Sequence, residues 1–102
     1  MSTYELYNPA TGLGFRKLNC DTRDSIEEKL SKAKRAQEGW LKTPLDDRID
    51  CLKRFNAQLG SKTDELALTL STETGKPIAQ ARGEILATPR RINYFIENVF
   101  RL

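Results

Sequence analysis

The chain has 102 residues, a length that fits one domain or part of one. It carries 17 Lys and Arg against 14 Asp and Glu, and the resulting net charge of +3 is too small to argue for a nucleic-acid partner. The sequence has no run of about 18 apolar residues, which argues against a membrane-spanning helix. Residues 1–5 do not resemble a basic and then apolar signal segment, so we expect a cytoplasmic protein.

The two cysteines, Cys20 and Cys51, occur in a chain without histidine. This combination lacks the usual ligand set of a zinc site. A single disulfide is one alternative, but reduced thiols are the expectation for a cytoplasmic protein. A nucleophilic cysteine normally needs a base such as histidine beside it. We therefore interpret both cysteines as structural.

Residues 4–18 form the only predicted β-structure, a two-stranded hairpin. The linker at residues 8–12 contains Asn, Pro and Gly, each of which favours a turn. A two-stranded ribbon is at best marginally stable alone, so this hairpin has to pack against another part of the chain.

Two helices are predicted after the hairpin, over residues 22–40 and 44–60. The first begins near a capping-box pattern at residues 25–28, and the second has Thr43 as its N-cap and Pro44 at its first position. One face of each helix is marked by residues at helical spacing. These are Ile26, Leu30, Ala33, Gln37 and Trp40 in the first, and Leu45, Ile49, Leu52, Phe55 and Leu59 in the second.

The stretch at residues 71–78 is predicted to end one helix and begin another. Gly75 permits the left-handed conformation that ends many helices, because it has no Cβ. Pro77 cannot continue that helix but suits the first turn of the next one. Lys76 places a positive charge near the unpaired carbonyls of the helix end. Helices are accordingly predicted over residues 63–74 and 77–102.

Pro89 lies inside the last predicted helix. It removes a backbone donor and clashes with the preceding turn, at a cost of about 3 kcal/mol in a regular helix. We predict either a kink at this position or a break with Thr88 as a fresh cap. The sequence as a whole predicts a mainly α fold, in which a short N-terminal β-hairpin precedes four to five amphipathic helices.

Three segments occur in an order and spacing that resemble the NAD(P)-dependent aldehyde dehydrogenases. Residues 7–12 (YNPATG) resemble the opening hairpin of that family, and residues 40–48 (WLKTPLDDR) resemble its "W…TP…ER" junction. Residues 73–85 (ETGKPIAQARGEI) resemble its "ETGKP…ARGE" segment, and Tyr94-Phe95 falls where the family often has paired aromatics. The match runs from about residue 5 to residue 100. Within the family, the sequence most resembles the semialdehyde dehydrogenase branch.

The resemblance implies an amino-terminal segment without an active site. Family members are several times longer, and their glycine-rich cofactor turn, catalytic Cys, general-base Glu and oxyanion-hole Asn match no residue here. Cys20 and Cys51 do not match the catalytic position, and the Gly12-Leu13-Gly14 stretch lacks the third Gly of a phosphate-binding turn. NAD(P) is therefore expected in the parent enzyme but not on this segment, which in the family packs on the dinucleotide-binding domain.

The resemblance also implies a monovalent-cation site. Some members hold such an ion with backbone carbonyls just before the Asn-Pro pair and with an acidic side chain after the Gly-Lys-Pro corner. The matching residues here are Leu6, Tyr7 and Glu84, and oxygen ligands suit such an ion. The alternative interpretation is that Glu84 is a solvated helix acid or pairs with an arginine.

Three functions follow from the sequence. The first is the amino-terminal piece of an aldehyde dehydrogenase, inactive alone, whose parent oxidises an aldehyde to a carboxylic acid through a thiohemiacetal. The second is an interaction module that self-associates, as a dimer or larger species, or docks on the remainder of an aldehyde dehydrogenase, because its apolar stripes lack their family partner. The third is a self-contained helical bundle with a nucleic-acid or regulatory role, which the weak net charge supports least.

Overall fold

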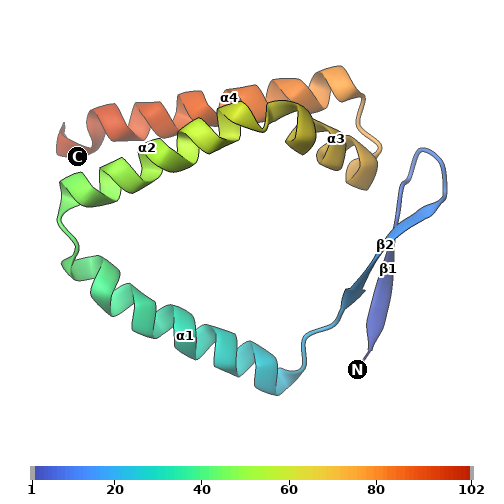
Figure 1. The fold of residues 1–102 in the computed structure, drawn as a ribbon, viewed down its shortest axis with the longest axis horizontal. Coiled ribbons are helices and arrows are strands. Elements are labelled where there is room, and N and C mark those ends of the chain that lie inside the picture. The colour runs from blue at the N-terminus through green and yellow to red at the C-terminus, as the bar shows by residue number, and fades with distance from the viewer. Residues whose placement is uncertain (1, 102) are drawn as a thin grey trace.

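The computed structural model describes residues 2–101, and within them a β-hairpin precedes four α-helices (Figure 1). Strands β1 (Thr3–Tyr7) and β2 (Gly14–Asn19) pair antiparallel, with Thr3 opposite Asn19. The fold class predicted from the sequence is confirmed. The helices are α1 (Arg23–Lys42), α2 (Leu45–Ser61), α3 (Thr63–Thr74) and α4 (Ile78–Asn98), and a 3-10 turn, η1 (Val99–Arg101), follows α4.

Asn8 organises the turn between the two strands. Its side-chain Oδ1 accepts a hydrogen bond from the Ala10 N–H at 2.9 Å, and its carbonyl oxygen accepts one from the Gly12 N–H at 2.8 Å. Its own N–H donates to the Leu13 carbonyl at 2.9 Å. The turn is thus held by an Asn side chain that mimics a backbone acceptor, as the sequence of the linker predicts.

Thr22 is the N-cap of α1. Its Oγ1 accepts a hydrogen bond from the Ser25 N–H at 3.2 Å, and the Ser25 Oγ accepts one from the Thr22 N–H at 2.9 Å. The capping box is therefore formed by Thr22 and Ser25, and the prediction that it spans residues 25–28 is wrong. The serine hydroxyl can take the place of the usual Glu because it reaches the same backbone donor.

Asp21 lies just before this cap, and the pH dependence of its carboxylate tests its contacts with Lys29 and Ser25. Its Oδ1 accepts hydrogen bonds from Lys29 Nζ at 2.7 Å and Ser25 Oγ at 2.8 Å, and these bonds lower the pKa of Asp21 from its ordinary value of 3.8. Because the folded-state pKa is lowered, the stabilisation is present above pH 3.8 and is lost as the pH falls through the folded value.

An NMR titration of the Asp21 carboxyl carbon is expected to give a pKa below 3.8 in the wild-type chain. In the Lys29→Met variant the pKa should rise toward 3.8, because the first and largest stabilising partner of the carboxylate is gone. Added salt should have the same direction of effect, since both side chains are well exposed. An identical pKa in the two proteins would contradict the role of Lys29.

Thr43 closes α1 and does not open α2. Its N–H donates to the Trp40 carbonyl at 3.1 Å, and its Oγ1 donates to the Gly39 carbonyl at 3.1 Å. Pro44 then takes an extended conformation and α2 begins at Leu45. The prediction of Thr43 as an N-cap is therefore wrong, because its polar groups satisfy carbonyls that the end of α1 leaves unpaired.

Helices α2 and α4 lie side by side and run in opposite directions (Figure 1). Asn56 of α2 links them, because its Nδ2 donates to the Pro89 carbonyl at 3.3 Å and to Asn93 Oδ1 at 2.9 Å. Helix α4 continues through Pro89, and the Thr88 Oγ1 donates back to the Glu84 carbonyl at 3.2 Å inside the same helix. Of the two alternatives drawn from the sequence, the break with Thr88 as a fresh cap is therefore wrong.

The small core lies along α4, where α2 and α3 pack against it. Ala67 of α3 and Ala81 of α4 are both 0% exposed, and Thr63 and Ile49 are each 8% exposed. Small side chains at a helix contact let the two backbones approach closely. No large side chain among residues 2–101 is fully buried, so the helices of this chain enclose little apolar volume of their own.

The described chain is open rather than compact. Its radius of gyration is 17.9 Å, whereas a compact domain of this length has a value of about 13 Å. Its accessible surface is 8300 Å², compared with about 5,800 Å² for a compact protein of this mass. Figure 1 shows α1 lying apart from the packed helices, and α1 has no buried residue. None of the described helices combines the length and apolar character needed to cross a membrane.

Candidate functional site

Side chains that could bind a metal ion are scattered over the described part of the chain. Residues 2–101 contain no cluster of three or more His, Cys, Asp or Glu side chains that could hold a metal ion. Cys20, between β2 and α1, and Cys51, on α2, are free thiols, and both are half-buried. Two other features are candidate sites: the corner between α3 and α4, and an apolar groove.

The corner is built around Gly75, which ends α3 in the left-handed conformation with φ of +73°, as predicted. The Gly75 N–H donates to the Ser71 carbonyl at 2.9 Å, and the Ser71 Oγ donates to the Lys76 carbonyl at 2.7 Å. Pro77 is extended and α4 begins one residue later, at Ile78. Pro77 is therefore the N-cap residue of α4 and does not belong to the first turn of that helix.

The turn of the hairpin packs against this corner. A Cβ added to Gly75 would lie 2.9 Å from the Pro9 Cγ and 3.6 Å from the Ala10 backbone nitrogen. Two of the three motif segments, residues 7–12 and residues 73–85, are thus brought together at one end of the molecule (Figure 1). The support that the marginal hairpin needs comes from the helix corner.

The residues of the predicted cation site lie on β1 and α4. Leu6 is half-buried and Tyr7 is exposed, and the Tyr7 hydroxyl donates to Glu5 Oε2 at 3.0 Å, which raises the pKa of Tyr7 from 10.0. The carboxylate of Glu84 pairs with the Lys76 ammonium group. The partner of Glu84 is therefore a lysine from the corner, and a monovalent cation at this carboxylate would compete with it. The cation site stays a prediction.

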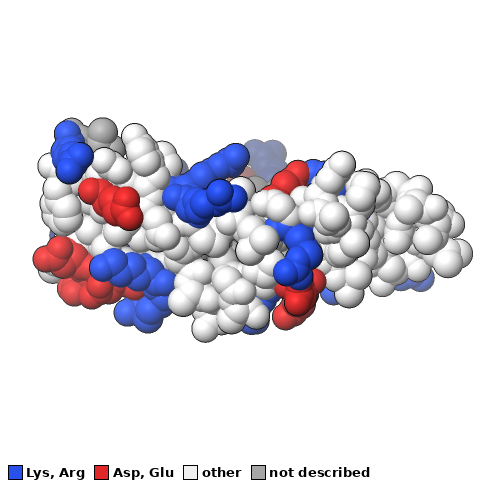
Figure 2. Space-filling model, turned by 90° about the horizontal axis from the view of Figure 1, so that it is seen from above, with Lys and Arg blue, Asp and Glu red and all other residues white. Residues whose placement is uncertain are grey.

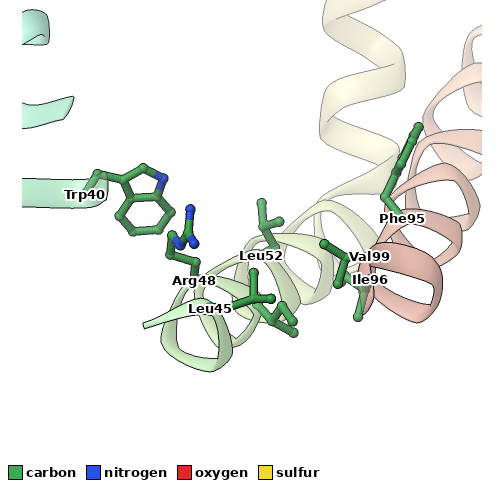
Figure 3. A pocket seen from close by; sticks show the side chains of 8 residues that line it. Trp40, Leu45, Arg48, Leu52, Phe95, Ile96 and Val99 are labelled. Carbon is green, nitrogen blue, oxygen red and sulfur yellow. The ribbon is translucent and has the colours of Figure 1, made fainter. Parts of the chain in front are cut away.

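The second feature, which we call the apolar groove, lies where the end of α1 and the start of α2 meet the end of α4 (Figure 3). Its volume is about 200 Å³. Eight residues line it: Trp40, Leu45, Arg48, Ile49, Leu52, Phe95, Ile96 and Val99. The third motif segment, residues 40–48, thus supplies three of the lining side chains.

The groove is open to solvent although its lining is apolar. Trp40 is 45%, Leu52 is 44% and Phe95 is 60% exposed. Arg48 is the one charged side chain of the lining and points into the groove between Trp40 and Leu52 (Figure 3). Its Nε is buried and has no hydrogen-bond partner among residues 2–101, and a buried donor without an acceptor is costly.

Charged residues of both signs are mixed on the surface. Figure 2 shows Lys and Arg interleaved with Asp and Glu over one face of the helices, and it shows little charge on the same face of the hairpin end. Ion pairs link several of them, including Arg82 with Asp64 and Lys32 with Glu28. This face carries no broad field of one sign that would select a highly charged partner.

Sequence reasoning identified the apolar stripes of the groove but missed two features. The sequence analysis used Arg48 only as part of the motif at residues 40–48. A single arginine among apolar residues at helical spacing is itself a signal of a charge that packs against them. Sequence reasoning also gave no reason for the contact between Pro9 and Gly75, because no periodicity links residues so far apart in the chain.

Comparison with known proteins gives consistent matches. The profile of the Aldehyde dehydrogenase family matches residues 1–102. The chain is 36% identical over 83 residues to the malonate-semialdehyde dehydrogenase of Bacillus pumilus, covering 81% of this chain and 17% of that protein. It is 35% identical over 77 residues to the N-succinylglutamate 5-semialdehyde dehydrogenase of Pseudomonas fluorescens, covering 76% and 16%.

A third relative extends the match. The succinate semialdehyde dehydrogenase [NAD(P)+] of Escherichia coli is 32% identical over 91 residues, covering 89% of this chain and 20% of that enzyme. The chain thus spans about a sixth to a fifth of the length of these curated relatives. Because the family profile matches all 102 residues of this chain, we conclude that the chain belongs to the aldehyde dehydrogenase family.

Proposed function

We propose that this chain supplies the amino-terminal helical segment of an NAD(P)-dependent aldehyde dehydrogenase and does not oxidise aldehydes by itself. The carrying observation is the open fold, in which only Ile49, Ala67 and Ala81 among residues 2–101 form a buried apolar core. A segment whose apolar stripes stay exposed fits a role in which the remainder of an enzyme covers them. The names of the relatives favour a semialdehyde as the substrate of the parent enzyme.

The lack of activity follows from the chemistry of the side chains. An aldehyde dehydrogenase of this family forms a thiohemiacetal, which requires a thiolate nucleophile, and the chain has only Cys20 and Cys51. By the resemblance to the family, neither matches the catalytic position, and the general-base Glu of the family matches no residue here. The described residues also form no glycine-rich turn at a helix start that would hold the pyrophosphate of NAD(P).

The test has two arms. The purified chain, given succinate semialdehyde with NAD⁺ or NADP⁺, is expected to form no NAD(P)H, whereas the Escherichia coli relative assayed in parallel does. A Cys20→Ser, Cys51→Ser double variant prepared in the same way controls for traces of host enzyme. Turnover that the wild-type chain shows and the double variant lacks would overturn the proposal of an inactive segment.

In the second arm, this chain replaces the aligned segment of the Escherichia coli enzyme. The chimera is expected to form NAD(P)H, and the same enzyme with the segment deleted is expected to form none. A folded chimera without activity, at unchanged yield, would argue that the segment does not support the parent fold.

The second candidate function is an interaction module, and the exposed stripes favour it as well. Ile26 and Leu30 on α1 are 54% and 53% exposed, and Phe55 on α2 is 53% exposed. Stripes of this kind either bind another surface or aggregate. The cytoplasmic location and the lack of a nucleic-acid partner stay predictions from composition.

A further inference from the structure

We propose that the apolar groove is a binding site for a small amphipathic carboxylate, which places its carboxylate on Arg48 and its aliphatic chain against Trp40 and Phe95. The site belongs to this chain as it stands and does not depend on a role in an aldehyde dehydrogenase. Three properties of the groove support it: the charge of Arg48, the apolar walls beside that charge, and the volume.

Arg48 brings a positive charge into the groove that no acidic side chain of the lining balances. The other seven lining residues are uncharged, and Arg48 belongs to none of the ion pairs formed among residues 2–101. Its acidic neighbours along α2, Asp46 and Asp47, are exposed and lie outside the lining. A partly buried charge is costly unless it is paired. The groove therefore favours an anion over a neutral molecule or a cation.

The terminal amino groups of Arg48 are the donors that a ligand can reach. The Nε is buried and unavailable to a ligand, but it is the only guanidinium nitrogen of Arg48 that is buried without an acceptor among residues 2–101. The side chain as a whole is half-buried and lies between Trp40 and Leu52, pointing into the groove (Figure 3). The two terminal groups of a guanidinium form a fork that matches the two oxygens of a carboxylate.

The walls beside this charge are apolar and accessible. Trp40, Leu52 and Phe95 are between 44% and 60% exposed, and they surround the position of Arg48 in the lining. An aliphatic chain that lies across them removes apolar surface of both molecules from water, and each buried methylene should tighten binding up to about fourfold. An inorganic anion lacks this contribution, so the groove favours an anion that carries an apolar chain.

The volume of the groove restricts the ligand to a small molecule. It is about 200 Å³, whereas sites for drug-sized ligands measure about 300–1,000 Å³. An arginine fork pairs with carboxylate or phosphate, and the small volume favours the smaller carboxylate. Hexanoate, a short aliphatic carboxylate, is therefore the probe that matches the charge, the walls and the size of the groove.

Two unique residues report on the groove in the full chain. Trp40 is the only tryptophan and Val99 the only valine of the sequence, and both line the groove. Titration with hexanoate should give a saturable change in Trp40 fluorescence and should shift the Val99 methyl signals in NMR spectra of valine-labelled chain. Both signals should yield the same dissociation constant. No saturable change in either signal would overturn the proposal.

Matched ligands test the part played by charge. Hexanol and hexylammonium have the same chain length as hexanoate but carry no negative charge. The dissociation constant should be at least fivefold higher for hexanol than for hexanoate, and higher still for hexylammonium. Equal binding of hexanoate and hexanol would show an unselective apolar surface and would refute a carboxylate site. This comparison uses the wild-type chain and does not depend on how any variant folds.

Matched variants assign the charge to Arg48. Arg48→Met keeps the apolar stem of the side chain and removes the guanidinium, so hexanoate should bind this variant no more tightly than hexanol does. Arg91→Met removes an exposed arginine of α4 outside the groove and should leave the dissociation constant of hexanoate within about twofold. Unchanged circular dichroism checks the fold of each variant. A preference for hexanoate that survives Arg48→Met, or that Arg91→Met removes, would rule out this site.

Discussion

Replacing Gly75 by alanine is expected to lower the free energy of unfolding by roughly 2–5 kcal/mol, measured by urea denaturation at fixed chain concentration. The backbone of Gly75 has φ of +73°, where a residue with a Cβ costs about 1–2 kcal/mol. The added Cβ would also approach the Pro9 Cγ to 2.9 Å, and a proline ring cannot swing aside as a flexible side chain does. The overpacked contact adds about 1–3 kcal/mol.

Gly12 provides the matched control for this prediction. It has the same φ of +73°, but a Cβ added there has no other atom within 4 Å apart from its chain neighbours. Gly12→Ala should therefore cost only the backbone contribution, about 1–2 kcal/mol. The difference between the two variants isolates the contact of the hairpin with the corner. Equal costs at both positions would show that the hairpin does not pack there in solution.

Replacing Ala81 by leucine is expected to destabilise the chain by about 1–3 kcal/mol, because the added carbons have no space between α3 and α4. Ala81 is 0% exposed and packs in the same small core as Ala67. Thermal unfolding followed by circular dichroism measures the effect.

Ala79→Leu is the control for Ala81→Leu, because Ala79 lies on the same helix turn but is exposed. Its effect should stay within about 0.5 kcal/mol, as is usual for surface positions. If the two substitutions proved equivalent, α3 and α4 would not pack as closely as the structure places them.

The architecture of this chain is well encoded in local sequence. The stripes of α1 and α2, the Asn8 turn and the helix end at Gly75 follow from side-chain spacing and from backbone preferences of single residues. The starts of the helices were less predictable. Thr43 and Pro44 suit a helix start in isolation, but the end of α1 uses the polar groups of Thr43 first, and such competition between neighbouring helix ends cannot be read from either motif alone.

Pro89 shows a second limit of local reasoning. By itself it predicts a disrupted helix, but in the folded chain α4 continues, and Asn56 from the neighbouring helix donates to the Pro89 carbonyl. The helix thus continues in spite of a local preference of about 3 kcal/mol against it, and local sequence alone does not reveal that outcome. The contact between Pro9 and Gly75 could not be predicted from local sequence either, because it depends on how the hairpin packs against the corner between α3 and α4.

The isolation of α1 has a consequence for the exchange of its amide hydrogens with solvent. This helix buries no residue, so its hydrogen bonds are protected only by its capping box and by exposed pairs such as Arg23 with Glu27. Its amides should therefore exchange through local fraying, at free energies well below that of global unfolding. Amides near Ala67 and Ala81 should exchange only when the whole chain opens. Covering α1 by another protein surface would then be visible as slowed exchange along this helix before any change appeared elsewhere.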